Sequence, residues 1–138
     1  MNKFFQFNDL YDKAEQFYER KLYLISLEYL NRALSFELPI SITRLSKAFE
    51  LRGLVRMQLN QYLASIIDFN KAINLNPGNA SLYYYRHLSH SVLSQYDEAI
   101  EDCKKLVFLE PEDQSHKESL KSLEEILKLN KRFKELND

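Results

Sequence analysis

Residues 62–77 read YLASIIDFNKAINLNP, and residues 96–111 read YDEAIEDCKKLVFLEP, a segment of the same kind 34 positions later. Apolar residues recur in both at three-to-four spacing, which predicts a helix with one buried face. Proline cannot continue a helix, so Pro77 and Pro111 mark where each segment ends. A fixed period of about 34 residues indicates one helical unit that is stacked on copies of itself.

The similarity extends upstream of these two segments. Arg52, Leu54, Leu59, Gln61, Tyr62, Ile66, Asp68, Lys71 and Leu75 recur as Arg86, Leu88, Leu93, Gln95, Tyr96, Ile100, Asp102, Lys105 and Leu109. We therefore expect repeats of two helices each at residues 46–79 and 80–113. The scarcity of glycine, at 2 residues, and of proline, at 3, favours helices that are joined by short links.

A more degenerate copy is expected at about residues 7–40. Tyr23, Leu24, Ser26, Asn31 and Ala33 recur as Tyr62, Leu63, Ser65, Asn70 and Ala72, an offset of 39. The longer offset places about five extra residues between Pro39 and Leu45. Ser41 or Thr43 is the expected N-cap of a lengthened helix in the middle repeat.

One more helix is expected at about residues 112–136. Its apolar stripe consists of Leu120, Leu123, Ile126, Leu127, Phe133 and Leu136, and its other faces are rich in lysine and glutamate. Such a helix suits the polar cap that a repeat array needs at its end. Its last ten residues are expected to extend past the repeats, where they would either fray or pack on a second copy. Met1 and this cap suggest a complete protein with a single domain, residues 1–138.

Composition narrows the class of protein. The net charge is -1 with both signs interspersed, which argues against a nucleic-acid partner, since that would need a basic stripe. One cysteine permits no internal disulfide. No apolar run approaches the roughly 20 residues of a membrane span, and no signal peptide is apparent. We therefore expect a soluble, cytoplasmic protein without a membrane partner.

These segments resemble the tetratricopeptide repeat (TPR) family, most clearly at Tyr62–Pro77 and Tyr96–Asp102. The family's small-residue positions, where two helices cross closely, hold Ala14 and Gly53 on first helices and Ser26, Ser65 and Ala99 on second helices. The resemblance implies an all-α, right-handed α-solenoid of about three helix-turn-helix repeats plus a C-terminal capping helix. His87 departs from the pattern because it stands where Gly53 predicts a small residue. We expect either wider helix packing in the last repeat or a His87 that leans toward an edge.

In this family the first helix of each repeat lines a concave groove. The resemblance therefore implies a groove lined by Asn8, Tyr11, Glu15, Tyr18, Glu19, Lys47, Glu50, Leu54, Met57, Gln58, Ser81, Tyr84, Leu88, Ser91 and Val92. This mixture of aromatic and aliphatic residues suits adaptable recognition. We expect a non-enzymatic adaptor or scaffold that binds a peptide or partner helix there. The alternative is that these residues form a merely solvated inner wall or pack on the cap helix. A second alternative is a structural module that self-associates through the C-terminal helix or the first repeat.

One subclass of the family binds the acidic C-termini of chaperones through a clamp of lysine, asparagine and arginine. The corresponding positions here hold Tyr11, Glu15, Leu51, Ser81 and Tyr85. These side chains supply no cationic fork for a carboxylate. The sequence therefore argues against that activity, and Glu15, Glu19 and Glu50 favour a basic or hydrophobic ligand segment.

Catalytic, metal and cofactor sites are not indicated. A site formed by His87, His90 and Cys103 is geometrically conceivable, but a buried histidine and an inert cysteine fit these repeat positions better. His116 is expected to be alone and exposed. Lys13, Arg52 and Arg86 recur at one repeat position, where they would either contact an acidic ligand or, as we favour, pair with nearby carboxylates.

Overall fold

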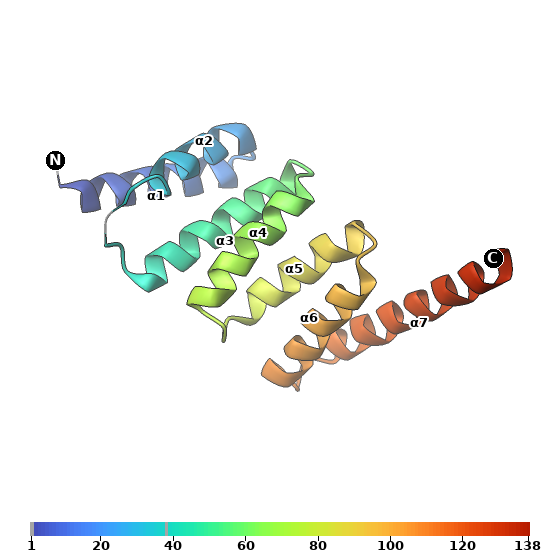
Figure 1. Cartoon of the computed structure of the whole chain (residues 1–138). Coiled ribbons are helices and arrows are strands. Elements are labelled where there is room, and N and C mark those ends of the chain that lie inside the picture. The colour runs from blue at the N-terminus through green and yellow to red at the C-terminus, as the bar shows by residue number, and fades with distance from the viewer. Residues whose placement is uncertain (1, 38) are drawn as a thin grey trace. The chain divides into compact units, whose positions relative to one another are not determined.

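The computed structural model describes residues 2–37 and 39–138, which form seven α-helices and no strand (Figure 1). The helices are α1 (Lys3–Glu19), α2 (Tyr23–Ala33), α3 (Ile42–Gln58), α4 (Tyr62–Leu75), α5 (Ala80–Val92), α6 (Tyr96–Leu109) and α7 (Gln114–Asn137). The all-α prediction is confirmed. The extra residues before α3 end at Ser41, whose hydroxyl accepts a hydrogen bond from the Arg44 backbone N–H at 3.3 Å, so Ser41 is the N-cap.

The chain divides into two compact units, Met1–Pro77 and Gly78–Asp138. In the first unit α1 packs on α2, α3 packs on α4, and both α1 and α2 contact α3. In the second unit α6 packs on both α5 and α7. A single domain that spans every repeat stays a prediction.

The turn inside each helical pair uses a left-handed residue that is not glycine. Lys21, Asn60 and Ser94 have φ angles of 60°, 59° and 57°. The N–H of the residue after each one donates to a carbonyl five residues earlier, as from Gln61 to Arg56 at 2.8 Å. This pattern closes the carbonyl end of a helix and reverses the chain within a few residues. It explains how three helical pairs form in a sequence with two glycines.

The core of the first unit is built on close helix crossings. A Cβ atom at Gly53 would lie 2.6 Å from the ring of Phe69, so only glycine lets α3 approach α4 this closely. The buried Ser26 hydroxyl donates to the Ala14 carbonyl at 2.7 Å and links α1 to α2. The small residues therefore do what the repeat pattern predicts, which is to bring two backbones together.

One part of the core of the second unit lies between α6 and α7. Ala99, Ile100, Cys103 and Leu123 are buried together, and Leu120 and Leu127 pack against them. His87 on α5 is only 6% exposed, so the expectation that it leans to an edge is wrong. Its ring packs edge-on against the ring of Tyr84, with centroids 5.4 Å apart.

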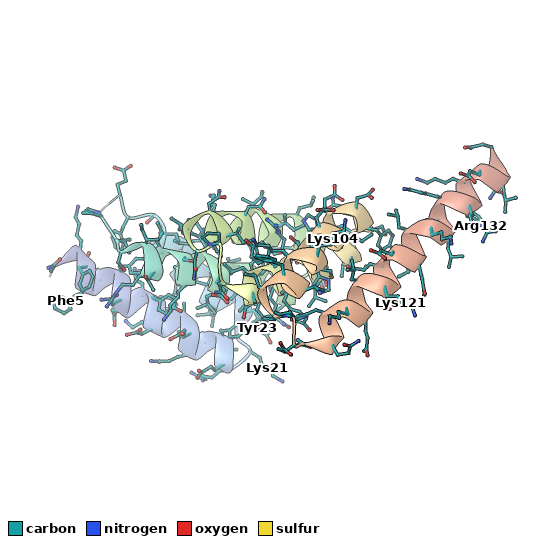
Figure 2. The ribbon with its side chains drawn as sticks, turned by 90° about the horizontal axis from the view of Figure 1, so that it is seen from below. Phe5, Lys21, Tyr23, Lys104, Lys121 and Arg132 are labelled. Carbon is teal, nitrogen blue, oxygen red and sulfur yellow. The ribbon has the colours of Figure 1, made fainter. Side chains whose placement is uncertain are left out.

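The C-terminal half of α7 runs beyond α6 (Figures 1 and 2). Figure 2 shows Arg132 on this projecting part and Lys121 nearer to α6. Leu129, Phe133 and Leu136 are 62%, 69% and 85% exposed. The cap helix thus packs in its unit through residues up to Leu127, and the apolar residues that follow are exposed. Within the described residues, none of the helices has the length and apolar character needed to cross a membrane.

Candidate functional site

A groove of about 510 Å³ lies between α1 and α3 in the first unit. We call it the α1–α3 groove, and its lining consists of Tyr11, Glu15, Tyr18, Glu19, Lys47, Glu50, Leu51 and Leu54. All of these except Leu51 are among the residues that the family resemblance implies for a groove, and Leu51 is one of the clamp positions. The first helices of two successive repeats present the same face, which is why residues so far apart in sequence meet here.

A second hollow of about 410 Å³ continues from this groove, since Tyr11 and Lys47 line both. Phe7, Asn8, Asp12 and Arg44 complete its lining. The Arg44 guanidinium donates a hydrogen bond to the Asn8 side chain and lies over the ring of Phe4. Sequence reasoning did not select Asp12 or Arg44. Arg44 precedes Lys47 by three residues on the same helix, which puts both side chains on one face. This spacing is the sequence signal that could have identified Arg44 as a lining residue.

Tyr11 is the half-buried centre of the site. Its hydroxyl donates to a carboxylate oxygen of Glu15 at 3.2 Å. Burial raises the pKa of the phenol, and the charge of Glu15 and this hydrogen bond raise it further. Tyr11 therefore stays protonated at all physiological pH values and acts as a hydrogen-bond donor. Tyr11 also packs against two core clusters of the first unit, one that contains Leu10 and one that contains Ala14.

Glu50 is a half-buried carboxylate of the groove. Burial raises its pKa, and only the positive charge of Lys47 opposes this effect. Within residues 2–37 and 39–138, no hydrogen bond or ion pair reaches the Glu50 side chain. A carboxylate that is partly removed from water and has no partner among these residues can accept a cation or an N–H donor from a ligand.

The other predicted groove residues lie apart from this lining. Met57 and Gln58 are at the end of α3, half-buried and exposed respectively. Tyr84, Leu88 and Ser91 lie on α5 in the second unit, together with the exposed Ser81 and Val92. The structure brings the residues of α1 and α3 into one groove and places those of α5 in a separate unit. Their role in binding stays a prediction.

Comparison with known proteins identifies the repeat. The family model described as tetratricopeptide repeat matches residues 46–79, and the same pattern recurs 34 residues later. The chain therefore contains a tetratricopeptide repeat (TPR). A relative, the human mitochondrial import receptor subunit TOM70, is 39% identical over 61 residues, which are 44% of this chain. This TPR chain spans about a tenth of the length of the curated relatives that it matches.

Solved structures confirm the helical-repeat fold, which is of the solenoid class. The yeast Hsp90 co-chaperone Cns1 aligns with a TM-score of 0.85 at 19% identity, over 99% of this TPR chain and 44% of that one. The first TPR domain of Spaghetti (RPAP3), bound to the Hsp90 peptide SRMEEVD, aligns with a TM-score of 0.77 at 18% identity, over 90% and 94% of the two chains. The family match supports a protein-interaction module as the general function of this chain.

Basic side chains at the repeated position of this TPR chain pair with carboxylates. Arg52 and Arg56 both bind the fully buried Asp68 at 2.8 Å, and Arg86 binds Asp102 at 2.6 Å. Lys13 pairs with Asp9 at 2.9 Å. The structure therefore agrees with the interpretation that these cations serve the fold. It also explains the repeated aspartate, which cross-links the two helices of a repeat.

The histidines lie differently from what the sequence suggested. His116 is buried, not exposed and alone, because the turn between α6 and α7 folds it against two carboxylates. Its Nε2 lies 2.7 Å from Glu110 and 3.5 Å from Asp113. These are the three side chains that cluster most like metal ligands in the part of the chain that the structure describes. They hold the turn, with Asp113 also capping α7 at the Ser115 N–H.

His87, His90 and Cys103 form no such cluster among the described residues. His90 Nδ1 is hydrogen-bonded to the Gln95 side chain at 2.7 Å. Burial raises the pKa of the Cys103 thiol to about 11, with the charge of Asp102 as a second cause. At neutral pH this cysteine is a thiol, which is a poor nucleophile and a poor metal ligand.

Proposed function

We propose that this chain is a protein-interaction module whose α1–α3 groove binds a partner segment carrying apolar side chains and a basic residue. The observation that supports this most directly is Glu50, a half-buried carboxylate without a hydrogen-bond partner among the described residues. A lysine or arginine of the partner would supply the missing counter-charge. The proposal assigns no chemical reaction to the chain.

The walls of the groove suit an apolar ligand side chain. Tyr11, Tyr18 and Leu54 are half-buried and present apolar surface beside the carboxylates. Aromatic side chains of this kind give large contact area at low entropic cost, because few torsions are lost on binding. Binding energy would come from these contacts, and the acidic residues would select the charge of the partner.

An acidic chaperone C-terminus is a poor ligand for this groove. The matched RPAP3 domain holds the acidic peptide SRMEEVD. The α1–α3 groove presents Glu15, Glu19 and Glu50 against a single lysine, Lys47, so an acidic peptide would meet like charge. We therefore propose that this TPR chain takes a ligand of the opposite sign.

Tyr84, Leu88 and Ser91 are proposed as a second contact surface on α5. Tyr84 is 42% exposed, and Leu88 is half-buried one turn further along the helix. The Ser91 hydroxyl donates to the His87 carbonyl at 2.7 Å, so its hydrogen is already engaged and it offers a ligand only its oxygen.

A peptide-display library tests both the site and the charge preference. We expect the wild type to enrich peptides that combine lysine or arginine with leucine or phenylalanine. The enriched peptides should bind Glu50→Gln about tenfold more weakly and Leu54→Ala about as weakly, because each variant removes one half of the proposed recognition. Glu28→Gln is the matched control, since Glu28 is an exposed acid on α2 outside the groove.

Two results would overturn this proposal. One is enrichment of peptides with an acidic C-terminus. The other is binding that Glu50→Gln and Leu54→Ala leave unchanged while both variants keep wild-type helicity. Tyr84→Ala examines the second surface separately, and unchanged affinity would remove Tyr84 from the site.

A further inference from the structure

The projecting end of α7 carries an apolar stripe that nothing in its unit covers. Ile126, Leu129, Phe133 and Leu136 recur at three-to-four spacing and are 38%, 62%, 69% and 85% exposed. At ~100° per residue, this stripe lies roughly a third of a turn around the helix from the stripe that packs on α6. The α6-facing stripe consists of Leu120, Leu123 and Leu127. The helix therefore has one apolar face for its own unit and a second one that is free.

The same stretch is strongly basic. We call residues 126–136 the basic segment. It contains one acidic residue, Glu135, and four basic residues, Lys128, Lys131, Arg132 and Lys134. Two such segments paired side by side would place like charges together, which opposes association through α7 alone. A surface that binds this stripe must therefore be both apolar and acidic.

The α1–α3 groove has both properties. Its apolar wall contains Tyr11, Tyr18 and Leu54, and its acids outnumber its one lysine. The lengths also match, since the stripe spans about 15 Å along α7 and the lining spans about 12 Å along α1, at 1.5 Å per residue. The positive charge that we propose for a ligand of the groove is thus present in the basic segment of the same chain.

We propose that the basic segment of one copy binds in the α1–α3 groove of a second copy. This inference rests on the proposed function, because it names the occupant of the same groove. The two contacting surfaces differ, so the contact is heterologous, and a pair of copies keeps one free groove and one free segment. Association therefore continues into short chains of copies as concentration rises, and salt weakens it.

Sedimentation of the full chain over a concentration series tests this inference. The wild type is expected to show a weight-average mass that grows with concentration. Glu15→Lys/Glu19→Lys reverses the groove charge, and Lys131→Glu/Arg132→Glu reverses the segment charge. Each double variant alone is expected to associate at least about tenfold more weakly. An equimolar mixture of the two is expected to recover association into chains of alternating copies, because the unchanged segment of the groove variant fits the unchanged groove of the segment variant, and the reversed charges complement each other at the next contact.

Matched variants keep this test specific. Lys117→Glu/Lys121→Glu makes the same charge change on the first half of α7, outside the basic segment, and is expected to associate as the wild type does. Leu129→Ala/Phe133→Ala removes the stripe without touching the α6 contact, so it is expected to keep helicity and lose association.

Several outcomes would overturn the inference. They are a wild type that stays monomeric up to millimolar concentration, association that all variants retain, or a mixture that fails to recover. Binding to phosphatidylserine vesicles without self-association would instead make the segment a membrane-surface element. In each case the peptide-display result stands on its own, so failure here does not decide whether the groove binds a different partner.

Discussion

The middle and last repeats fill the same position between two helices in opposite ways. In the middle repeat, Gly53 on α3 meets the fully buried ring of Phe69 on α4. In the last repeat, 34 residues later, the corresponding residues are His87 on α5 and Cys103 on α6, both buried. The ring has moved to the first helix and the small side chain to the second. A repeat can therefore depart from the family pattern at two positions and still fill the space between its helices, because total volume matters more than residue identity.

The two repeats also differ in how they hold their buried aspartate. Asp68 accepts hydrogen bonds from both Arg52 and Arg56. Asp102 accepts from Arg86, but the residue corresponding to Arg56 is His90, which bonds to Gln95 instead. The middle repeat thus concentrates more charge around one carboxylate than the last repeat does, and we expect it to depend on that carboxylate more heavily.

Removal of these aspartates is expected to give the largest effect. Asp68→Ala leaves two largely buried arginines without their partner, and we expect it to lower the free energy of unfolding by about 3–5 kcal/mol. Asp102→Ala leaves fewer arginines without their carboxylate. We therefore expect its loss in the free energy of unfolding to be about 1–2 kcal/mol smaller than that of Asp68→Ala. Urea unfolding followed by circular dichroism measures both. Asp9→Ala, which breaks the exposed pair with Lys13, is the control and should cost no more than about 0.5 kcal/mol.

An Asp102→Ala loss equal to or larger than that of Asp68→Ala would contradict this comparison. It would mean that the second arginine adds nothing to the middle repeat. The difference between the repeats would then lie in packing alone.

The glycine position tests the packing half of the comparison. Gly53→Ala places a Cβ atom 2.6 Å from the fully buried ring of Phe69, and overpacking of this kind costs about 1–3 kcal/mol. Better helix propensity returns up to about 1 kcal/mol, so we expect a net loss of about 1–2 kcal/mol in the free energy of unfolding. Addition of Phe69→Leu to Gly53→Ala should recover part of that loss in the same urea experiment.

Gly78→Ala is the matched control for this substitution. A Cβ atom at Gly78 would meet nothing within 4 Å, and its φ angle is not positive. This control should be neutral or slightly stabilising. A Gly53→Ala variant that behaves like Gly78→Ala would show that the α3–α4 crossing has room to relax.

Much of this fold could be predicted because its signals are local and repeated. Pro77 and Pro111 separate α4 from α5 and α6 from α7, and Ser41 caps α3 as expected. The left-handed turn residues Lys21 and Asn60 could not be predicted, because any residue can be forced into that conformation when the surrounding hydrogen bonds require it. Helix content follows from periodicity, whereas turn geometry is decided by the packing of the two helices that the turn joins.

In the candidate site, too, some features could be predicted from sequence spacing and others depend on the packing of the helices. The repeat pattern identifies which side chains of α1 and α3 share a face, so Tyr11 and Leu54 could be selected from the sequence. That Glu50 has no partner among the described residues depends on which groups surround it in space, and no spacing rule shows this. The prediction for His116 is wrong for a similar reason, since its contact with Glu110 crosses a turn whose geometry the sequence does not reveal.

The smallest expected effect is a pH dependence of stability that His87 gives to the last repeat and that the middle repeat lacks. Burial lowers the pKa of His87, and the charges of His116 and His90 lower it further, while Asp102 opposes them. The ordinary value in the unfolded chain is about 6.5. The unfolded state therefore binds the proton more readily, so stability is fully present above about pH 6.5 and is lost as pH falls from there toward the lower folded pKa. The slope cannot exceed about 1.4 kcal/mol per pH unit for one proton.

Urea unfolding at pH 7.5 and pH 5.5 isolates this effect when the wild type is compared with His87→Gln. The variant keeps a polar side chain of similar length but cannot take up the proton, so it should lose less stability between the two pH values. His90 and His116 are present in both proteins, so the difference reports the titration of His87 together with its charge coupling to these two histidines. An identical pH response would mean that water reaches His87 Nδ1, which has no hydrogen-bond partner among the described residues. The middle repeat offers no such response because its corresponding residue is Gly53, and the exchange of ring and small side chain would then be what gives the last repeat its sensitivity to acid.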